Sequence, residues 1–365
     1  ESGKMLVHSN ETPIPTSTNE DLPGRTHGAG LLRPIGFRLK HGAVSLIALA
    51  IAQQAHAQTA QSASTLPNGG VFVAGQGSIG TPVDGTLTVT QSSNRGVIDW
   101  RRLSIGSDAA VTIDNGAGAT LNRVIGTDMS RIDGSLKATG SLYLMNSNGV
   151  VISSGGQVVT GGSFIASTRD IPTGQFMAGG TIAATGTSDG AIVNQGKVTA
   201  RDGDVVMIGR SVTNNGTISA GNGTASLIAA DSVLLTTVGG PSGIYVATGG
   251  GAGDVSNGGA IDAASVALRA AHGNVYTLAG NRTGNINATG VANVGGQVFL
   301  TADQGTVQAT GAITARNADG TGGEITANGA NVVVDGNARL DATGSLGGSV
   351  LLGTSAPGGH NLAQS

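Results

Sequence analysis

The chain has no cysteine and few aromatic or charged residues. Without cysteine it forms no disulfide, no thiolate metal site and no cysteine nucleophile. Aromatic residues make up 2% of the 365 residues and charged residues 11%, where about 25% charged is ordinary. The formal net charge of −3 leaves no overall basic field that would attract nucleic acid. Any core must therefore consist of small and medium-sized aliphatic side chains.

Proline is also scarce, with nine residues, whereas glycine is abundant, with 63. Glycine without a strict Gly-X-Y repeat excludes collagen. Apolar residues reach 39% and the mean hydropathy is +0.11, so the composition is not that of a charged, hydrophobe-poor disordered chain. This composition favours a repetitive β architecture over a compact sphere.

The N-terminal part of the chain has the pattern of a targeting segment. Basic residues precede an apolar run over 42–52, and Ala55 and Ala57 follow it in the small-x-small arrangement of a cleavage site. The run is shorter than the roughly 20 helical residues that span a bilayer. We expect an extended bacterial Sec-type signal peptide over 1–57 that is cut after Ala57. A cytosolic amphipathic helix is the alternative interpretation.

Short segments of alternating apolar and polar residues recur after residue 71. Residues 86–90 and 111–114 have the period of two that is typical of strands, and residues 205–208 follow it less cleanly. No window of about a dozen residues has the 3.6-residue period of an amphipathic helix. The sequence therefore predicts an all-β protein.

The later part of the chain repeats itself. Residues 193–200 return at 213–220, and three short copies begin at the evenly spaced positions Ile286, Ile313 and Leu340. Sequence periods of roughly 20 to 50 residues indicate stacked supersecondary units. Short strands joined by Gly and Asn turns, where the left-handed conformation is cheap, predict a parallel β-helix rather than a helical or leucine-rich solenoid.

One position of the repeat carries asparagine in Asn194, Asn214 and Asn257. Side chains at equivalent positions of stacked strands lie above one another, so these amides are able to form a ladder. Asparagine acting only as a turn former explains the pattern equally well.

Other motifs favour structural interpretations over chemistry. The G-x-G-x-x-G match at 75–80 leads into a turn and a strand, not into the helix that a dinucleotide site needs. Asp202 and Asp204 lack the further oxygen ligands of a calcium site, so we expect a turn there. Trp100 is expected to be a core anchor and His272 a turn residue. We predict no catalytic residue, no cofactor and no metal site.

Several segments, in this order and spacing, resemble the N-terminal secretion domain of two-partner secretion exoproteins, also called the filamentous-haemagglutinin haemagglutination-activity domain. The likeness is greatest to the high-molecular-weight-adhesin branch. The segments are residues 66–70, 96–100, 121–126, 142–150 and 162–168.

The family's Asn-Pro-Asn-Gly turn is similar to Asn146-Ser147-Asn148-Gly149, with Ser147 in the place of proline. The second family motif, Asn-Pro-Asn-Leu, is absent, as in the adhesin branch. The resemblance implies a secretion motif made of these four residues, with Asn122 and Arg123 packed near it. The motif either serves recognition or nucleation, or is a structural turn without partner contact.

The resemblance also implies a domain plan. We expect a short linker over 58–65, the secretion domain over 66–238 and further β-helix repeats over 239–365, with more repeats beyond Ser365. The implied fold is a right-handed parallel β-helix with an N-terminal cap.

The implied function is export without catalysis. After passage through the Sec machinery, an Omp85-type outer-membrane transporter would recognise the unfolded domain, which then folds outside a Gram-negative cell. The payload is expected to be a surface adhesin or haemagglutinin that binds a host-cell receptor or glycan and no nucleic acid. The alternatives are a parallel β-helix carbohydrate-active enzyme, or the same family with a haemolysin, haem-acquisition or toxin payload.

Overall fold

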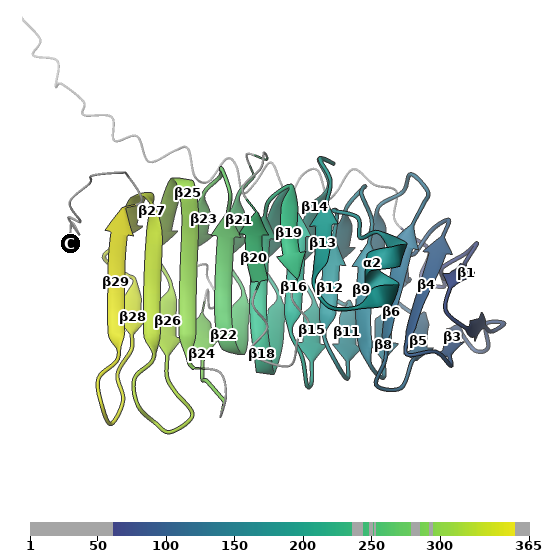
Figure 1. Cartoon of the computed structure of the whole chain (residues 1–365), viewed down its shortest axis with the longest axis horizontal. Coiled ribbons are helices and arrows are strands. Elements are labelled where there is room, and N and C mark those ends of the chain that lie inside the picture. Colours follow the sequence, from purple (N-terminus) through teal and green to yellow (C-terminus); the bar gives the residue numbers. More distant parts are fainter. Residues whose placement is uncertain are drawn as a thin grey trace, which may run out of the picture. The chain divides into compact units, whose positions relative to one another are not determined.

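The computed structural model describes residues 61–235, 244–247, 251, 253–278, 285–291 and 295–354. The expected signal peptide, with Ala55 and Ala57, lies outside these residues. The described chain has many strands and one short helix, and it winds into a parallel β-helix, whose successive rungs lie side by side in Figure 1. The predicted all-β, parallel β-helix fold is confirmed.

Three stacks of strands form the sides of the β-helix, and we call them faces A, B and C. Face A contains β3 (Thr86–Gln91), β5 (Ala110–Asp114), β8 (Ser135–Ala138), β11 (Gln157–Thr160), β15 (Lys197–Ala200), β24 (Ile286–Ala288), β26 (Ala312–Ala315) and β28 (Arg339–Asp341). Face B contains β4 (Arg95–Trp100), β6 (Ala119–Val124), β9 (Ser141–Met145), β12 (Phe164–Ser167), β16 (Val205–Gly209) and β29 (Ser349–Thr354). Face C contains β7 (Ser130–Ile132), β10 (Val150–Ile152), β14 (Ala191–Asn194), β17 (Ser211–Asn214), β21 (Val255–Asn257) and β23 (Val275–Thr277).

Four long strands turn a corner and belong to two faces. β18 (Thr217–Ala229) and β22 (Ala260–Ala270) run from face A into face B. β25 (Gln297–Ala309) and β27 (Glu324–Val334) run from face B into face C.

Two antiparallel strands cap the first rung. β1 (Val71–Ala74) pairs with β4, and β2 (Gly77–Ile79) pairs with β3. Open strand edges template unwanted pairing, so a cap that reverses the strand direction ends the parallel stack at this side. The expected N-terminal cap is thus present.

The interior of the β-helix is a thin aliphatic core. Every second side chain of a strand points inward, and pairing in register places these side chains in columns. The inward column of face A contains Leu87, Val111, Leu136, Val158, Val198, Ile218, Ile261, Ile286, Ile313 and Leu340. The evenly spaced copies at Ile286, Ile313 and Leu340 therefore stand one rung apart, as the sequence repeat predicted.

The amide ladder is present at the end of face C. Asn194 donates from Nδ2 to Oδ1 of Asn214 at 2.7 Å, and Asn214 donates in the same way to Asn257 at 2.7 Å. All three side chains are fully buried. Stacking thus satisfies polar groups that would otherwise be costly inside the protein.

At the corner between faces C and A, glycine is required by a lack of space and not by an unusual backbone angle. Gly196, Gly216 and Gly259 follow one another at this corner, and none of them has a positive φ. A Cβ on each would collide with the backbone carbonyl of the glycine in the preceding rung. The sequence-based explanation by left-handed turns is therefore wrong for this column, because the close approach of the rungs is what requires glycine.

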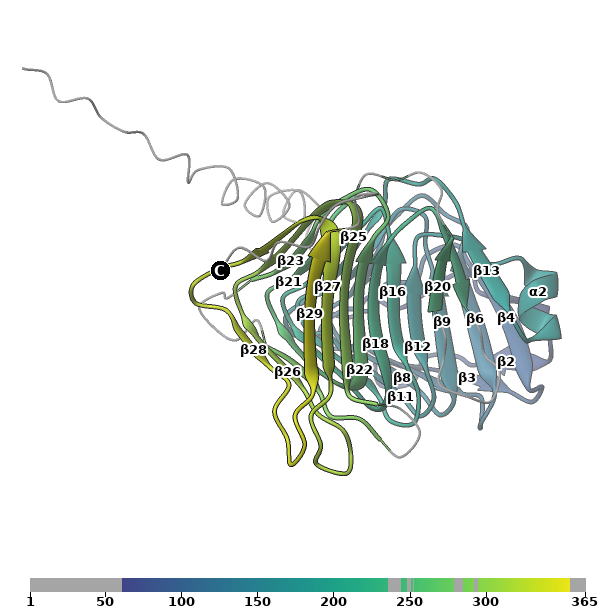
Figure 2. The same cartoon turned by 60° about the vertical axis from the view of Figure 1, so that its left-hand side comes forward.

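Two segments leave the β-helix and cover part of face B. They form α2 (Thr173–Ala178) and an antiparallel sheet of β13 (Ile182–Thr185), β19 (Ser232–Leu235) and β20 (Ile244–Ala247). We call these four elements the clasp (Figure 2). Outward-facing side chains of face B and inward-facing ones of α2, β13 and β19 make a second apolar core beneath it.

We expect the middle rung of the amide ladder to be the most sensitive to mutation. Asn214→Ala removes the donor to the buried Oδ1 of Asn257 and leaves the Nδ2 of Asn194 only the Thr217 carbonyl at 3.4 Å, which should lower the free energy of unfolding by about 1–3 kcal/mol. The measurement is urea denaturation followed by circular dichroism. Asn222→Ala, at an exposed asparagine, is the control and should change stability by less than about 0.5 kcal/mol. Equal effects of the two variants would contradict a stabilising ladder.

Candidate functional site

The segments that carry the family resemblance meet in the first rungs. Residues 96–100, 121–124, 142–145 and 164–167 belong to β4, β6, β9 and β12, which pair with one another in sequence order on face B. The remaining segment, 66–70, lies against the end of β4, where Asn68 bridges to Arg102. Segments that are separated along the sequence therefore form one contiguous region.

The motif turn connects β9 to β10 at the corner between faces B and C. The Gly149 N–H donates to the Asn146 carbonyl at 3.0 Å, which closes a β-turn with Ser147 and Asn148 as its central residues. Asn146 is 1% exposed, whereas Ser147 and Asn148 are exposed. Gly149 has φ +111°, a conformation that favours glycine.

The buried Asn146 amide joins this turn to the preceding rung. Its Nδ2 donates to the Asp128 carbonyl at 2.9 Å and to Oγ of Ser130 at 3.0 Å. Its Oδ1 accepts from the backbone N–H of Asn148 at 2.9 Å. Asn148 in turn donates from Nδ2 to the Gly126 carbonyl at 2.9 Å. The two asparagines thus fix the turn, and only the middle of the turn remains open to a partner.

Asn122 and Arg123 lie in β6, in register with Leu144 and Met145, the residues that lead into the turn. Asn122 is 1% exposed, and its Oδ1 accepts from Nε1 of Trp100 at 2.9 Å inside the β-helix. Trp100 is buried, as expected of a core anchor. Asn122 therefore orients the only tryptophan of the chain rather than the motif turn.

Arg123 points away from the interior and holds the start of the clasp. Its guanidinium donates to the Ile171 carbonyl at 2.7 Å and to the carboxylates of Asp170 at 2.9 Å and Asp99 at 3.2 Å. The structure thus places Asn122 and Arg123 in the strand beside the motif. Asn122 is hydrogen-bonded to Trp100, and Arg123 is hydrogen-bonded to the start of the clasp.

Arg169 is a second anchor of the clasp, and sequence reasoning missed it. Its guanidinium is fully buried and donates to the carbonyls of Ala230 at 2.8 Å and Ser188 at 2.7 Å and to Asp231 at 2.8 Å. Burial lowers the pKa of Arg169, and the Asp231 carboxylate opposes that shift. Arg169 and Asp231 are 62 positions apart, so no local sequence pattern predicts this ion pair.

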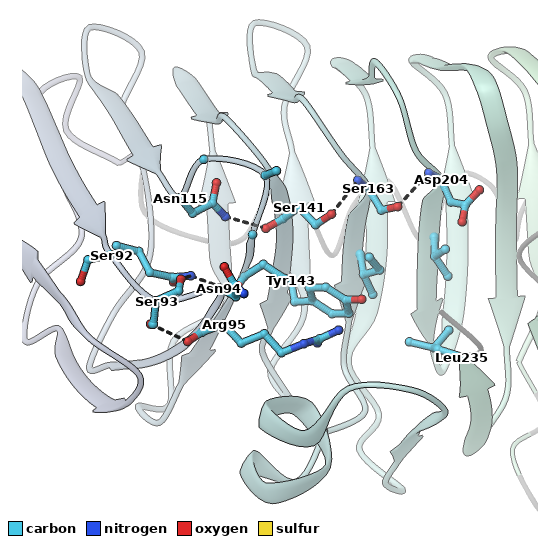
Figure 3. Close-up of a pocket in the computed structure, with 17 residues that line it drawn as sticks. Ser92, Ser93, Asn94, Arg95, Asn115, Ser141, Tyr143, Ser163, Asp204 and Leu235 are labelled. Atoms are coloured by element: carbon cyan, nitrogen blue, oxygen red, sulfur yellow. Dashed lines mark hydrogen bonds between the residues drawn. The ribbon is translucent and has the colours of Figure 1, made fainter. Parts of the chain in front are cut away.

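A polar groove of about 710 Å³ follows the corner between faces A and B beside the clasp (Figure 3). Side chains at the corner bond to the backbone of the next rung. The Ser163 N–H donates to Oγ of Ser141 at 3.1 Å, and the Asp204 N–H donates to Oγ of Ser163 at 3.0 Å. Arg95 and Tyr143 lie in the same groove, and burial raises the pKa of the Tyr143 hydroxyl.

Lys137 and Lys197 are far apart in the sequence, and from the sequence alone we expect no basic cluster such as a β-helix polysaccharide lyase needs. The fold brings them onto the same outer face, in β8 and β15, with only β11 between these strands. Neighbours in register with Lys137 are Thr112 and Val159. Sequence separation is thus a poor guide to distance in a solenoid.

No group of three or more His, Cys, Asp or Glu side chains among the described residues is arranged to hold a metal ion. No helix within the described ranges has the length and apolar character needed to cross a bilayer.

Comparison with known proteins gives matches in one family. The chain matches the TPS secretion domain over residues 57–315. It is 30% identical over 272 residues to the heme/hemopexin-binding protein of Haemophilus influenzae strain Rd, an alignment that covers 71% of this chain and 30% of that protein. A second Haemophilus influenzae heme/hemopexin-binding protein is 38% identical over 87 residues, which are 23% of this chain and 9% of that protein.

A solved structure has the same fold. The HMW1 secretion domain from Haemophilus influenzae superposes with a TM-score of 0.69 at 28% identity, covering 79% of this chain and 76% of that domain. The chain spans less than a third of the length of the curated relatives that it matches.

The geometry of the motif turn predicts opposite effects of proline at its two central positions. Ser147 is at position i+1, where proline is favoured, so Ser147→Pro should raise the free energy of unfolding by about 0.4–1 kcal/mol. Asn148→Pro removes the N–H that donates to Asn146 and should destabilise the protein by more than that. Urea denaturation of both variants checks this. Stabilisation by proline at 148, or none at 147, would contradict the turn geometry.

Proposed function

Because the chain belongs to the TPS secretion domain family, we propose that residues 66–238 direct its two-partner secretion through a dedicated outer-membrane transporter. The observation that carries this proposal is the assembly of the motif segments into the first rungs of face B. The TPS secretion domain is a domain of secreted exoproteins and not an enzyme family. We extend this to the chain and propose that it has no catalytic activity.

The fold supports a mechanism in which folding outside the cell draws the chain outward. Each rung pairs with the one before it, so a β-helix is able to grow rung by rung as residues emerge. The chain has no disulfide to obstruct a narrow pore. The clasp adds a step, because Arg169 reaches Ala230 and Asp231 only after those residues have emerged.

The route before that step is also part of the proposal. The Sec machinery would deliver the unfolded chain to the periplasm of a Gram-negative cell. Periplasmic receptor domains of an Omp85-type transporter would then bind an exposed strand by β-augmentation. The exposed Ser147 and Asn148 are the part of the motif turn that such a partner, or a folding nucleus, is able to use.

The protein delivered by this route is proposed to be a surface adhesin that binds a host-cell receptor or glycan. Haem acquisition is a second candidate, because the relative that is 30% identical is a heme/hemopexin-binding protein. Titration of the secreted protein with haemin separates the two, since a bound haem shifts its absorbance band and adhesion does not require one.

The test of the secretion proposal is expression of the whole chain in a bacterial host with and without the neighbouring transporter gene. We expect protease-resistant protein in the medium only when the transporter is present. Asn146→Ala combined with Asn148→Ala should abolish or strongly reduce this export, because both side chains fix the motif turn.

Two controls separate recognition from general stability. Asn222→Ala changes an exposed side chain outside the motif and should be exported normally. Asn214→Ala weakens the fold outside the motif and should be exported better than the double variant. Equal export without the transporter would overturn two-partner secretion. Equal loss with Asn214→Ala would assign the motif a purely structural role.

The expected signal peptide predicts the start of the exported protein. Cleavage after Ala57 gives an N-terminus at Gln58, which Edman degradation or mass spectrometry of the secreted chain detects. Ala57→Leu places a large residue at the cleavage site and should leave the uncleaved precursor in the cell. An exported protein that starts elsewhere would contradict the predicted site.

A further inference from the structure

The groove beside the clasp contains two hydrogen-bond donors, the Arg95 guanidinium and the Tyr143 hydroxyl, whose side chains lie close together. Arg95 and Tyr143 both pack on the ring of Phe176 in α2: the Tyr143 ring meets it edge to face at 5.1 Å, and the Arg95 guanidinium lies 5.1 Å from its centroid. Figure 3 shows the two side chains pointing the same way along the groove. Phe176 of α2 thus positions the Arg95 guanidinium and the Tyr143 ring side by side in the groove.

Neither tip is fully used by the protein. Arg95 donates from Nη1 to the Phe176 carbonyl at 3.0 Å, but among the described residues its Nε and Nη2 have no hydrogen-bond partner. Tyr143 is 4% exposed, and its hydroxyl likewise has no partner in the described part of the chain. Because Arg95 and Tyr143 line the groove, an acceptor from a ligand is able to reach these donors.

The rest of the groove supplies small polar groups. Ser92, Ser93 and Asn94 line one side, and Ser141 and Ser163 line the corner. Asp204 lies beyond Ser163, where its carboxylate accepts the Thr224 N–H at 2.8 Å. Hydroxyl and amide groups recur in successive rungs that are about 4.8 Å apart, beside the apolar side chains of Ile165, Val206 and Leu235, so the groove suits an extended chain of hydroxyl-bearing units.

We propose that this groove binds an oligosaccharide that carries a carboxylate, such as a uronic acid chain. The Arg95 Nε and Nη2 form the planar edge that matches a carboxylate, and the Tyr143 hydroxyl donates to the same group. The serine and asparagine groups pair with sugar hydroxyls, and Asp204 accepts one at the far end. The groove volume lies within the range of small-molecule sites.

A flat apolar ligand fits the same groove poorly. A porphyrin buries two large faces and needs apolar walls, whereas polar atoms make up the larger part of this lining. The Tyr143 ring is also unavailable for stacking on a ligand, because it is buried against Phe176. The recognition therefore comes from hydrogen bonds to the edges of the groove.

The test is isothermal titration of the purified full chain with a galacturonic acid tetrasaccharide and with the neutral galactose tetrasaccharide. We expect binding of the acidic sugar, weaker binding at high salt, and little binding of the neutral one. Tyr143→Phe keeps the ring on Phe176 and removes only the hydroxyl, so it should weaken binding by about tenfold with an unchanged thermal midpoint. Tyr276→Phe, on face C, is the matched control and should bind normally.

Arg95 requires two variants, because its Nη1 also holds the clasp. Arg95→Gln should abolish the preference for the acidic sugar, and Arg95→Lys, which keeps the charge but not the planar edge, should retain part of it. Equal affinity for both sugars, no binding of either at millimolar concentration, or unchanged affinity of Tyr143→Phe would overturn the proposal. Tighter binding of an acidic peptide of similar charge would also overturn it. The assay needs no transporter, so its outcome is independent of the secretion assay.

Discussion

The structure depends on the in-register pairing of each rung with the one before it. Pairing in parallel places side chains at equivalent positions directly above one another. Each side chain must therefore pack well against a similar side chain in the next rung. Aliphatic side chains form the inward columns, and Asn194, Asn214 and Asn257 satisfy one another in a column of their own. Glycine occupies the corner where the rungs are too close for a Cβ. A chain poor in aromatic residues is stable in this arrangement because stacking replaces a thick core.

The clasp buries the outer surface of face B. It converts the outer surface of face B into a second core, so β6 and β9 are buried on both sides. Arg123 and Arg169 hold it by hydrogen bonds to backbone carbonyls and to aspartates. This cover links rungs that are not neighbours, and it also forms the wall of the groove in which Arg95 and Tyr143 converge. The secretion domain is thus more than the first part of a uniform solenoid.

The motif turn consists of the four residues that the sequence resemblance identified, and each has a different role in its structure. Asn146 and Asn148 fix the turn through their side-chain hydrogen bonds. Gly149 adopts a positive φ that favours glycine, and Ser147 is exposed at the centre of the turn. Asn122 and Arg123 are neighbours of the motif in register, but they serve Trp100 and the clasp. Hydrogen-bond partners from distant segments cannot be read from spacing, which explains this difference.

The sequence by itself determined the strand period, the rung length and the amide column, because these follow from local alternation and from repetition along the chain. It also contained a sign of the clasp, since residues 142–145 are continuously apolar where a one-sided strand would alternate. Only the tertiary structure decided what covers that strand, which carbonyls Arg169 reaches, and that Lys137 and Lys197 share a face. Those contacts join residues far apart in the sequence, and their geometry is set by how many residues each rung and each insertion contains.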